Sequence, residues 1–261
     1  MDEWYDILPH VSYPKMVWYA QCSQLFHGIS ESHIQHVQWK RLGLTECAKN
    51  GDVQGVRYLV ERCAADVHRD DEEALREASR NGHLEMVRYL VESGKANVHA
   101  WGEEALLRAS RNGHLEVVKY LVERCGANVH ACVIRYAGWE WALRCASRNG
   151  HLEVVRYLVE VGGADVHAFD EDALRCASRN GHLEVVRYLV EEGKADVHAD
   201  RDLALQWASC KGHLEVVRYL VEEGKADVHA DRDLALQWAS EGCHFEVVEY
   251  LKSKGVFQAM Q

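Results

Sequence analysis

The chain has 261 residues, of which 48% are hydrophobic and 27% are charged, an ordinary balance for a globular protein with a continuous core. Its formal net charge of −11 argues against a nucleic-acid surface, which normally carries a basic stripe. No stretch approaches the ~18 apolar residues of a membrane span, and the polar N-terminus lacks a signal-peptide pattern. We therefore expect an intracellular protein, cytoplasmic or nuclear, that binds neither membranes nor nucleic acid.

Residues 1–41 lack the internal repetition found further along the chain. Pro14 can open a helix that runs through Phe26, and Ser30 can cap a second helix. A Leu-Pro start, a Pro-initiated helix, an apolar stretch with a cysteine and a closing Trp-Lys-Arg-Leu at 39–42 resemble an F-box. This resemblance implies docking onto the adaptor of a cullin-type ubiquitin ligase. The alternative hypothesis is a helical cap that shields the following repeats with Trp4, Trp18 and Trp39.

Residues 42–257 are built from a motif close to NGHLEVVRYLVE, followed by GKADVHA and ALRCASR. The glycine of this motif recurs mostly every 31 residues, and a six-residue insertion lengthens one interval to 37. Its occurrences are Gly51, Gly82, Gly113, Gly150, Gly181, Gly212 and Gly242. A period of this size is typical of solenoids, in which each unit packs on its neighbours and presents an extended surface. Residues 258–261 follow as a short C-terminal tail.

Each repeat predicts two helices. After Asp172, small and apolar residues recur on one face of a first helix, which predicts tight packing. Acidic residues such as Asp172 favour the N-terminus of this helix by capping and by offsetting the helix dipole. Gly181 then permits a sharp turn, and a second helix with a broad apolar face begins at about Leu183. An all-α fold of about seven helix-turn-helix repeats with short connecting loops is therefore expected.

The last repeat carries a signal that the stack ends. One position of the second helix is valine in the five preceding repeats, and Lys252 stands there in the last one. Burying a valine is worth about 1.5 to 3 kcal/mol. The lysine therefore predicts that no further repeat packs on this helix.

These motifs resemble the ankyrin repeat. ALRCAS or LALQWAS stands where that family has TPLHLAA, and a Gly-His turn joins the two helices. The segments NGHLEVVRYLVE and ADVHAD are similar to ankyrin arrays that large DNA viruses and some protists encode in multiple copies. The unit is shorter than the usual length of about 33 residues, because the loop between Val197 and Ala204 is trimmed. This trimming argues against the full projecting hairpins of the family.

The resemblance implies a scaffold, which we expect to be monomeric, that binds a partner protein through its loop tips and the groove-facing side of its first helices. The tips are rich in acids, among them Asp70, Asp71, Glu72, Glu103, Asp170, Glu171, Asp200, Asp202, Asp231 and Asp233. Arg108, Arg144 and Arg175 on the adjoining helices are candidate partner contacts. Pairing within a repeat, such as Glu171 with Arg175 at i, i+4, is the alternative hypothesis.

Aromatic residues are the stronger candidates, because binding energy concentrates in Trp, Tyr and Arg anchors. They are Trp101 and Phe169 at loop tips, Trp207 and Trp238 on first helices, and Tyr136, Trp139 and Trp141 in the insertion at 132–141. Exposed aromatic area in the insertion predicts a partner site. A loop that folds back on its own unit is the alternative there, and a packing role is the alternative for the two first-helix tryptophans.

Histidine recurs after the turn glycine and after the loop valine. Neighbouring helices lie about 8 to 10 Å apart, whereas a zinc ligand lies within about 2.1 Å of the metal. These ladders therefore predict turn and loop hydrogen bonds, and no metal. Because no catalytic motif such as HExxH, a phosphate loop or a nucleophile elbow occurs, we expect no enzyme activity and no cofactor. The predicted function is a protein interaction scaffold, with substrate recruitment to a ubiquitin ligase through residues 1–41 as the alternative.

Overall fold

The computed structural model describes residues 31–131, 133–135 and 138–258. The chain divides into two compact units, residues 1–100 and 101–261. The first unit contains α2 (Glu31–Lys49), α3 (Val53–Cys63), α4 (Arg69–Arg80) and α5 (Leu84–Glu92). Most of the F-box-like segment precedes Glu31 and lies outside the described residues. The cap hypothesis and the division of the chain at residues 42 and 258 stay predictions.

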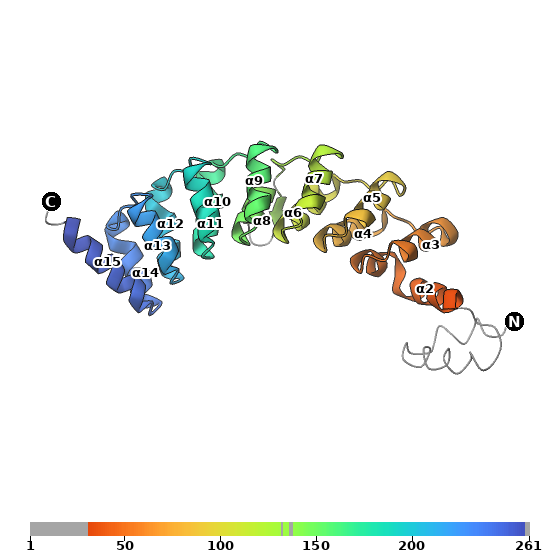
Figure 1. The fold of residues 1–261 in the computed structure, drawn as a ribbon, viewed down its shortest axis with the longest axis horizontal. Helices are drawn as coiled ribbons and strands as arrows, with labels where there is room; N and C mark the ends of the chain where they lie inside the picture. Colours follow the sequence, from red (N-terminus) through yellow and green to blue (C-terminus); the bar gives the residue numbers. More distant parts are fainter. Residues whose placement is uncertain (1–30, 132, 136–137, 259–261) are drawn as a thin grey trace. The chain divides into compact units, whose positions relative to one another are not determined.

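The second unit is formed by helices that follow one another in pairs (Figure 1). They are α6 (Ala100–Arg111) and α7 (Leu115–Glu123), α8 (Ala142–Arg148) and α9 (Leu152–Glu160), α10 (Ala168–Arg179) and α11 (Leu183–Glu191), α12 (Ala199–Cys210) and α13 (Leu214–Glu222), and α14 (Ala230–Glu241) and α15 (Phe245–Gln258). The first helices α8, α10, α12 and α14 pack on one another in that order, and α9, α11, α13 and α15 do the same. The predicted helix-turn-helix solenoid is confirmed.

The insertion departs from an all-helical fold. It forms a short antiparallel hairpin of β1 (Val133–Arg135) and β2 (Gly138–Glu140), in which Ile134 pairs with Trp139. Tyr136 lies outside the described residues. The hairpin is a local addition between α7 and α8, and the repeats on either side of it keep their helix pairs.

The glycine turns at Gly51, Gly113, Gly150, Gly181 and Gly212 each receive a histidine ring from the next repeat. Gly150 has φ +76°, a conformation that glycine adopts without a steric penalty. The Nε2–H of His182 donates to the Arg148 carbonyl at 2.9 Å, and that of His213 donates to the Arg179 carbonyl at 3.0 Å. These bonds satisfy carbonyls at the ends of the first helices, which have no partner inside their own helix. The hydrogen-bonding role predicted for the turn histidines is confirmed.

Equivalent residues form the core in successive repeats. Val185, Val186 and Leu189 of α11 are buried, and so are Ala173 and Ala177 of α10. Small side chains on the first helices let their backbones approach closely, while the branched side chains of the second helices supply most of the apolar area. The second helix begins at Leu183, as predicted.

A second set of contacts joins successive second helices on their outer side. The hydroxyl of Tyr219 donates to Glu191 at 3.1 Å, and the guanidinium of Arg187 lies over the Tyr219 ring, 5.5 Å from its centroid. The same contacts recur around Tyr188 and Tyr250. Burial, followed by the hydrogen bond and charge of Glu191, raises the pKa of Tyr219 to about 12. The tyrosine hydroxyl therefore stays protonated and remains a donor at neutral pH.

The two ends of the chain differ from the interior repeats. Trp39 in α2 is buried, donates to Asp52 at 2.5 Å, and lies beside the stacked rings of His36 and Tyr58. At the other end, Lys252 is exposed, as the sequence predicted. No helix in the described ranges is long and apolar enough to cross a membrane.

Candidate partner-binding surface

In five repeats, the second to fourth residues of the first helix form a left-handed turn. This turn stands where the family has its projecting hairpin. In one of these repeats, Asp200, Arg201 and Asp202 have φ values of 48°, 57° and 58°. The same turn occurs at residues 70–72, 101–103, 169–171 and 231–233. Left-handed conformations cost roughly 1–2 kcal/mol for each residue other than glycine. Such turns persist only where surrounding contacts fix them.

The third residue of the turn supplies one of those contacts. Glu171 is 4% exposed and accepts a hydrogen bond from Nδ1 of His167 at 2.6 Å. Asp202 is 5% exposed, lies 3.0 Å from His198, and also accepts from the backbone N–H of Asp227 at 3.1 Å. The sequence placed Glu72, Glu103, Glu171 and Asp202 at exposed tips, and that placement is wrong. All four are buried, because the turn directs its third side chain inwards.

The first two residues of each turn are exposed, and the five turns carry four different pairs. They are Asp70 and Asp71, Trp101 and Gly102, Phe169 and Asp170, Asp200 and Arg201, and Asp231 and Arg232, all of them exposed. Trp101 is 56% exposed and Phe169 is 49% exposed. Trp101 and Phe169 thus lie at the tips, as predicted. We call these residues the tip pairs.

Trp141 of the insertion does not add exposed aromatic area, and that expectation was wrong. It is 6% exposed and stacks on Phe169 with ring centroids 4.5 Å apart, while Arg144 lies 5.8 Å from its ring centroid. The aromatic ring gains more by covering Phe169 and its own repeat than by facing water. The C-terminal end of the insertion therefore packs against the turn of the following repeat. Trp139 lies in β2, and its partner role stays a prediction.

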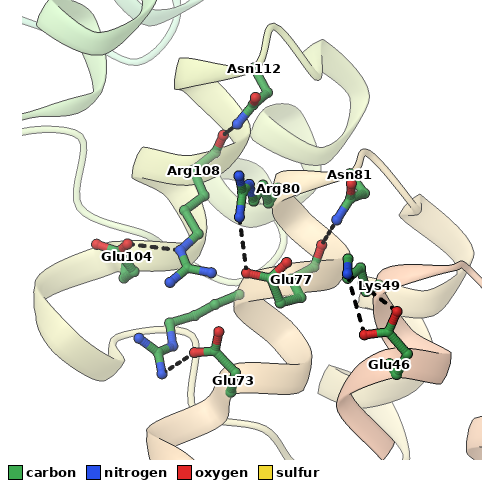
Figure 2. A network of polar contacts seen from close by, with 10 residues as sticks. Glu46, Lys49, Glu73, Glu77, Arg80, Asn81, Glu104, Arg108 and Asn112 are labelled. Atoms are coloured by element: carbon green, nitrogen blue, oxygen red, sulfur yellow. Dashed lines mark hydrogen bonds and ion pairs between the residues drawn. The ribbon is translucent and has the colours of Figure 1, made fainter. Parts of the chain in front are cut away.

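The three candidate arginines are occupied by ion pairs within the chain. Arg108 donates to Glu104 at 2.8 Å, one of several such pairs on the first helices (Figure 2). Arg144 reaches from α8 to Asp172 of α10 at 2.6 Å. Arg175 contacts Asp172 at 3.1 Å and Asp200 of α12 at 3.4 Å, so the predicted pair with Glu171 is wrong. Arg144 and Arg175 connect successive first helices, whereas Arg108 pairs within α6. Any partner role for the three arginines stays a prediction.

Trp207 and Trp238 lie on α12 and α14 and are each partly exposed. Their ring centroids are 5.3 Å apart, and Arg179 of α10 lies over Trp207 at 4.3 Å. The two rings therefore form one aromatic pair across neighbouring repeats. Both rings pack on a neighbour and also face solvent. The structure is therefore compatible with a packing role and with partner binding for these tryptophans.

Sequence reasoning missed the loop histidines as partners of the buried acids. His68 and Glu72, His167 and Glu171, and His198 and Asp202 are each four residues apart, and the same spacing joins His229 to Asp233 at 2.6 Å. This spacing was visible in the sequence. The hydrogen bond was not predicted because a left-handed turn lies between the two residues. In the described part of the chain, no group of three or more His, Cys, Asp or Glu side chains is placed to hold a metal ion.

His167 makes stability depend on pH. The hydrogen bond and then the charge of Glu171 raise the pKa of His167 above its ordinary 6.5. A raised pKa in the folded state stabilises the fold fully below the ordinary value, and the contribution is lost as pH rises through the folded pKa. We expect His167→Gln to lower the unfolding midpoint more at a pH just below 6.5 than at alkaline pH.

Urea unfolding of the parent and of His167→Gln across this pH range measures the effect. His213→Gln is the matched control, because burial lowers the pKa of His213 and reverses the sign of its pH dependence. Its stabilising contribution is lost as pH falls through the ordinary 6.5. A destabilisation by His167→Gln that does not vary with pH would contradict the charged pair.

The fold and this surface define a helix-turn-helix repeat protein whose exposed turns are held on a regular scaffold. A family model for ankyrin repeats (3 copies) matches residues 44–132, 137–201 and 193–260, and one for ankyrin repeats (many copies) matches residues 106–159. The chain belongs to the ankyrin-repeat family. No curated protein matches it significantly. Ankyrin repeats generally mediate protein–protein interaction and are typically not enzymes.

Proposed function

We propose that the chain is a non-enzymatic scaffold that captures a partner protein on its tip pairs and on the adjoining face of its first helices. The observation that carries this proposal is that four of the five left-handed turns bury their third side chain and expose the first two. Glu171 is buried against His167 and fixes the backbone, whereas Phe169 and Asp170 are held in solvent. A fixed frame with variable outward side chains is suited to recognition, because little conformational entropy is lost on binding.

Exposed aromatic tips support a protein partner. The large apolar side chains of Trp101 and Phe169 are each about half exposed. Both residues have a positive φ, a backbone conformation that is unfavourable for bulky residues. Phe169 is further braced from below by Trp141 at 4.5 Å. Rigid aromatic side chains of this kind are the residues that most often dominate binding energy in protein interfaces.

Trp101→Ala, alone and combined with Phe169→Ala, tests this proposal. We expect Trp101→Ala to lower the affinity for the partner about thirtyfold, and the double variant to lower it further, because one aromatic anchor contributes about 2 kcal/mol or more. Affinity purification with quantitative mass spectrometry identifies the partner, and titration with the purified partner measures the change. Circular dichroism confirms that helical content is kept.

Phe245→Ala is the matched control, because Phe245 is 74% exposed but lies at the start of α15 and outside the tip pairs. Its loss is expected to leave partner affinity unchanged. Thermal unfolding of both variants separates binding from stability, because Phe169→Ala also removes a ring from Trp141. Equal affinity of the parent and Trp101→Ala, together with a loss in Phe245→Ala, would contradict the assignment to the tips.

A further inference from the structure

Two arginines of the second unit lack the ion pairs that hold the preceding arginine of the same first helix. Arg148 ends α8 and Arg179 ends α10, and both are exposed. Among the residues that the structure describes, neither has a carboxylate within ion-pair distance. Arg144 and Arg175, one turn earlier on the same helices, are held by Asp172. Two exposed cations without carboxylate partners thus lie one repeat apart.

Arg179 is directed towards the next first helix, and its guanidinium lies over Trp207 of α12 at 4.3 Å. Arg148 occupies the same sequence position one repeat earlier, at the end of α8. The row therefore runs from Arg148 past Arg179 to the aromatic pair of Trp207 and Trp238, whose centroids are 5.3 Å apart. We call these four residues the first-helix strip.

The charge of the strip changes along its length. The position of Arg148 and Arg179 is taken by Cys210 in α12 and by Glu241 in α14. One end of the strip is therefore cationic, the middle is aromatic, and an exposed carboxylate follows. The complementary ligand carries negative charge at one end only and an apolar side chain beside it.

We propose that the first-helix strip binds an extended acidic segment of a partner protein, with carboxylates on Arg148 and Arg179 and an apolar or aromatic side chain on Trp207 and Trp238. This inference rests on the proposed function and names the partner chemistry for the first-helix face. Arginine binds carboxylates through paired hydrogen bonds, and tryptophan gives a broad apolar contact.

The spacing of the repeats sets the spacing of the ligand. Neighbouring helices lie about 8 to 10 Å apart, and an extended chain advances about 3.3 Å per residue. Residues that contact successive first helices are therefore about three positions apart in the ligand. The expected pattern is an acidic residue, a second acidic residue three positions later, and an aromatic residue three positions after that. Glu241 disfavours a further acidic residue at the far end.

The probe is a dye-labelled synthetic peptide with two glutamates and a phenylalanine at this spacing, in a glycine and serine background that disfavours helix. Fluorescence anisotropy with the full-length chain measures its affinity. We expect Arg148→Gln and Arg179→Gln each to weaken binding about tenfold, as for loss of one charge-assisted hydrogen bond. Affinity should also fall as ionic strength rises.

Arg187→Gln is the matched control. Arg187 is exposed and lies over the Tyr219 ring at 5.5 Å, but it belongs to a second helix. It repeats the cation and ring geometry of Arg179 outside the strip, and its loss should leave peptide affinity unchanged. A peptide with glutamines in place of glutamates, and one with the two glutamates adjacent, should both bind at least tenfold more weakly, in line with the loss of charge-assisted contacts.

Several results would overturn the proposal. They are no measurable binding, equal binding of the glutamine or adjacent-glutamate peptide, and unchanged affinity in Arg179→Gln. A single-stranded oligonucleotide that binds more tightly than the peptide through the same arginines would assign the strip to a phosphate backbone instead. The outcome is separable from that of the proposed function, because Trp101→Ala reports on the tip pairs with the natural partner and not on the synthetic peptide.

Discussion

Replacing Leu205 with alanine is expected to lower the free energy of unfolding of the second unit by about 2 to 5 kcal/mol, and replacing Leu236 by less than half as much. The two leucines occupy the same position in identical stretches of sequence, residues 181–209 and 212–240. Leu205 is 0% exposed because α14 packs on α12, whereas Leu236 in α14 is partly exposed. The difference therefore measures what one neighbouring repeat contributes.

Urea unfolding followed by circular dichroism gives both values, and each variant is the other's control because the local sequence is the same. Gln206 and Gln237 repeat the contrast, since Gln206 is 2% exposed and Gln237 is exposed. Equal destabilisation by Leu205→Ala and Leu236→Ala would contradict the exposed outer face of α14. It would show that this face is covered in solution.

Gly150→Ala is expected to destabilise the second unit by about 2 to 3 kcal/mol, from the left-handed backbone and from loss of a hydrogen bond. Gly150 has φ +76°, and a Cβ atom there would lie 2.5 Å from Nδ1 of His182. The ring must move, and its hydrogen bond to the Arg148 carbonyl at 2.9 Å is then lost. Thermal unfolding of the purified variant measures the change.

Gly126→Ala is the control for backbone strain alone. Gly126 has φ +71° and nothing within 4 Å of an added Cβ, so we expect a loss of only about 1 kcal/mol. In the background of His182→Ala, the effect of Gly150→Ala should fall to this smaller value, because the ring that clashes is absent. If Gly150→Ala and Gly126→Ala are equally destabilising, the histidine turn does not couple the repeats.

Local sequence features predicted the scaffold well. The start of the second helix at Leu183, the turn at Gly150 and the end signal at Lys252 all follow from periodicity, glycine placement and side-chain polarity. Each of these features is set by interactions within one repeat or between a repeat and its copy. The repeat pattern of the sequence therefore predicts the helix pairs and their stacking.

The candidate surface was predicted less completely. Trp101 and Phe169 lie at exposed tips as expected, but Glu171 was expected to pair with Arg175 and instead pairs with His167. The error has a backbone cause. The i, i+4 rule assumes a right-handed helix, and residues 169–171 are left-handed, which turns Glu171 inwards. The same turn left Trp141 free to stack under Phe169.

The sequence by itself determined the number and kind of repeats, the glycine turns and the apolar faces, because these depend on residues close together in the chain. Only the tertiary structure decided which acids are buried, which arginines are paired and which aromatic rings face solvent. The contrast in burial between Leu205 and Leu236 shows why the sequence could not decide these features. Their surrounding sequences are identical, yet one is enclosed and the other is not, because burial is conferred by the repeat that packs next to a residue and not by the residue's own segment.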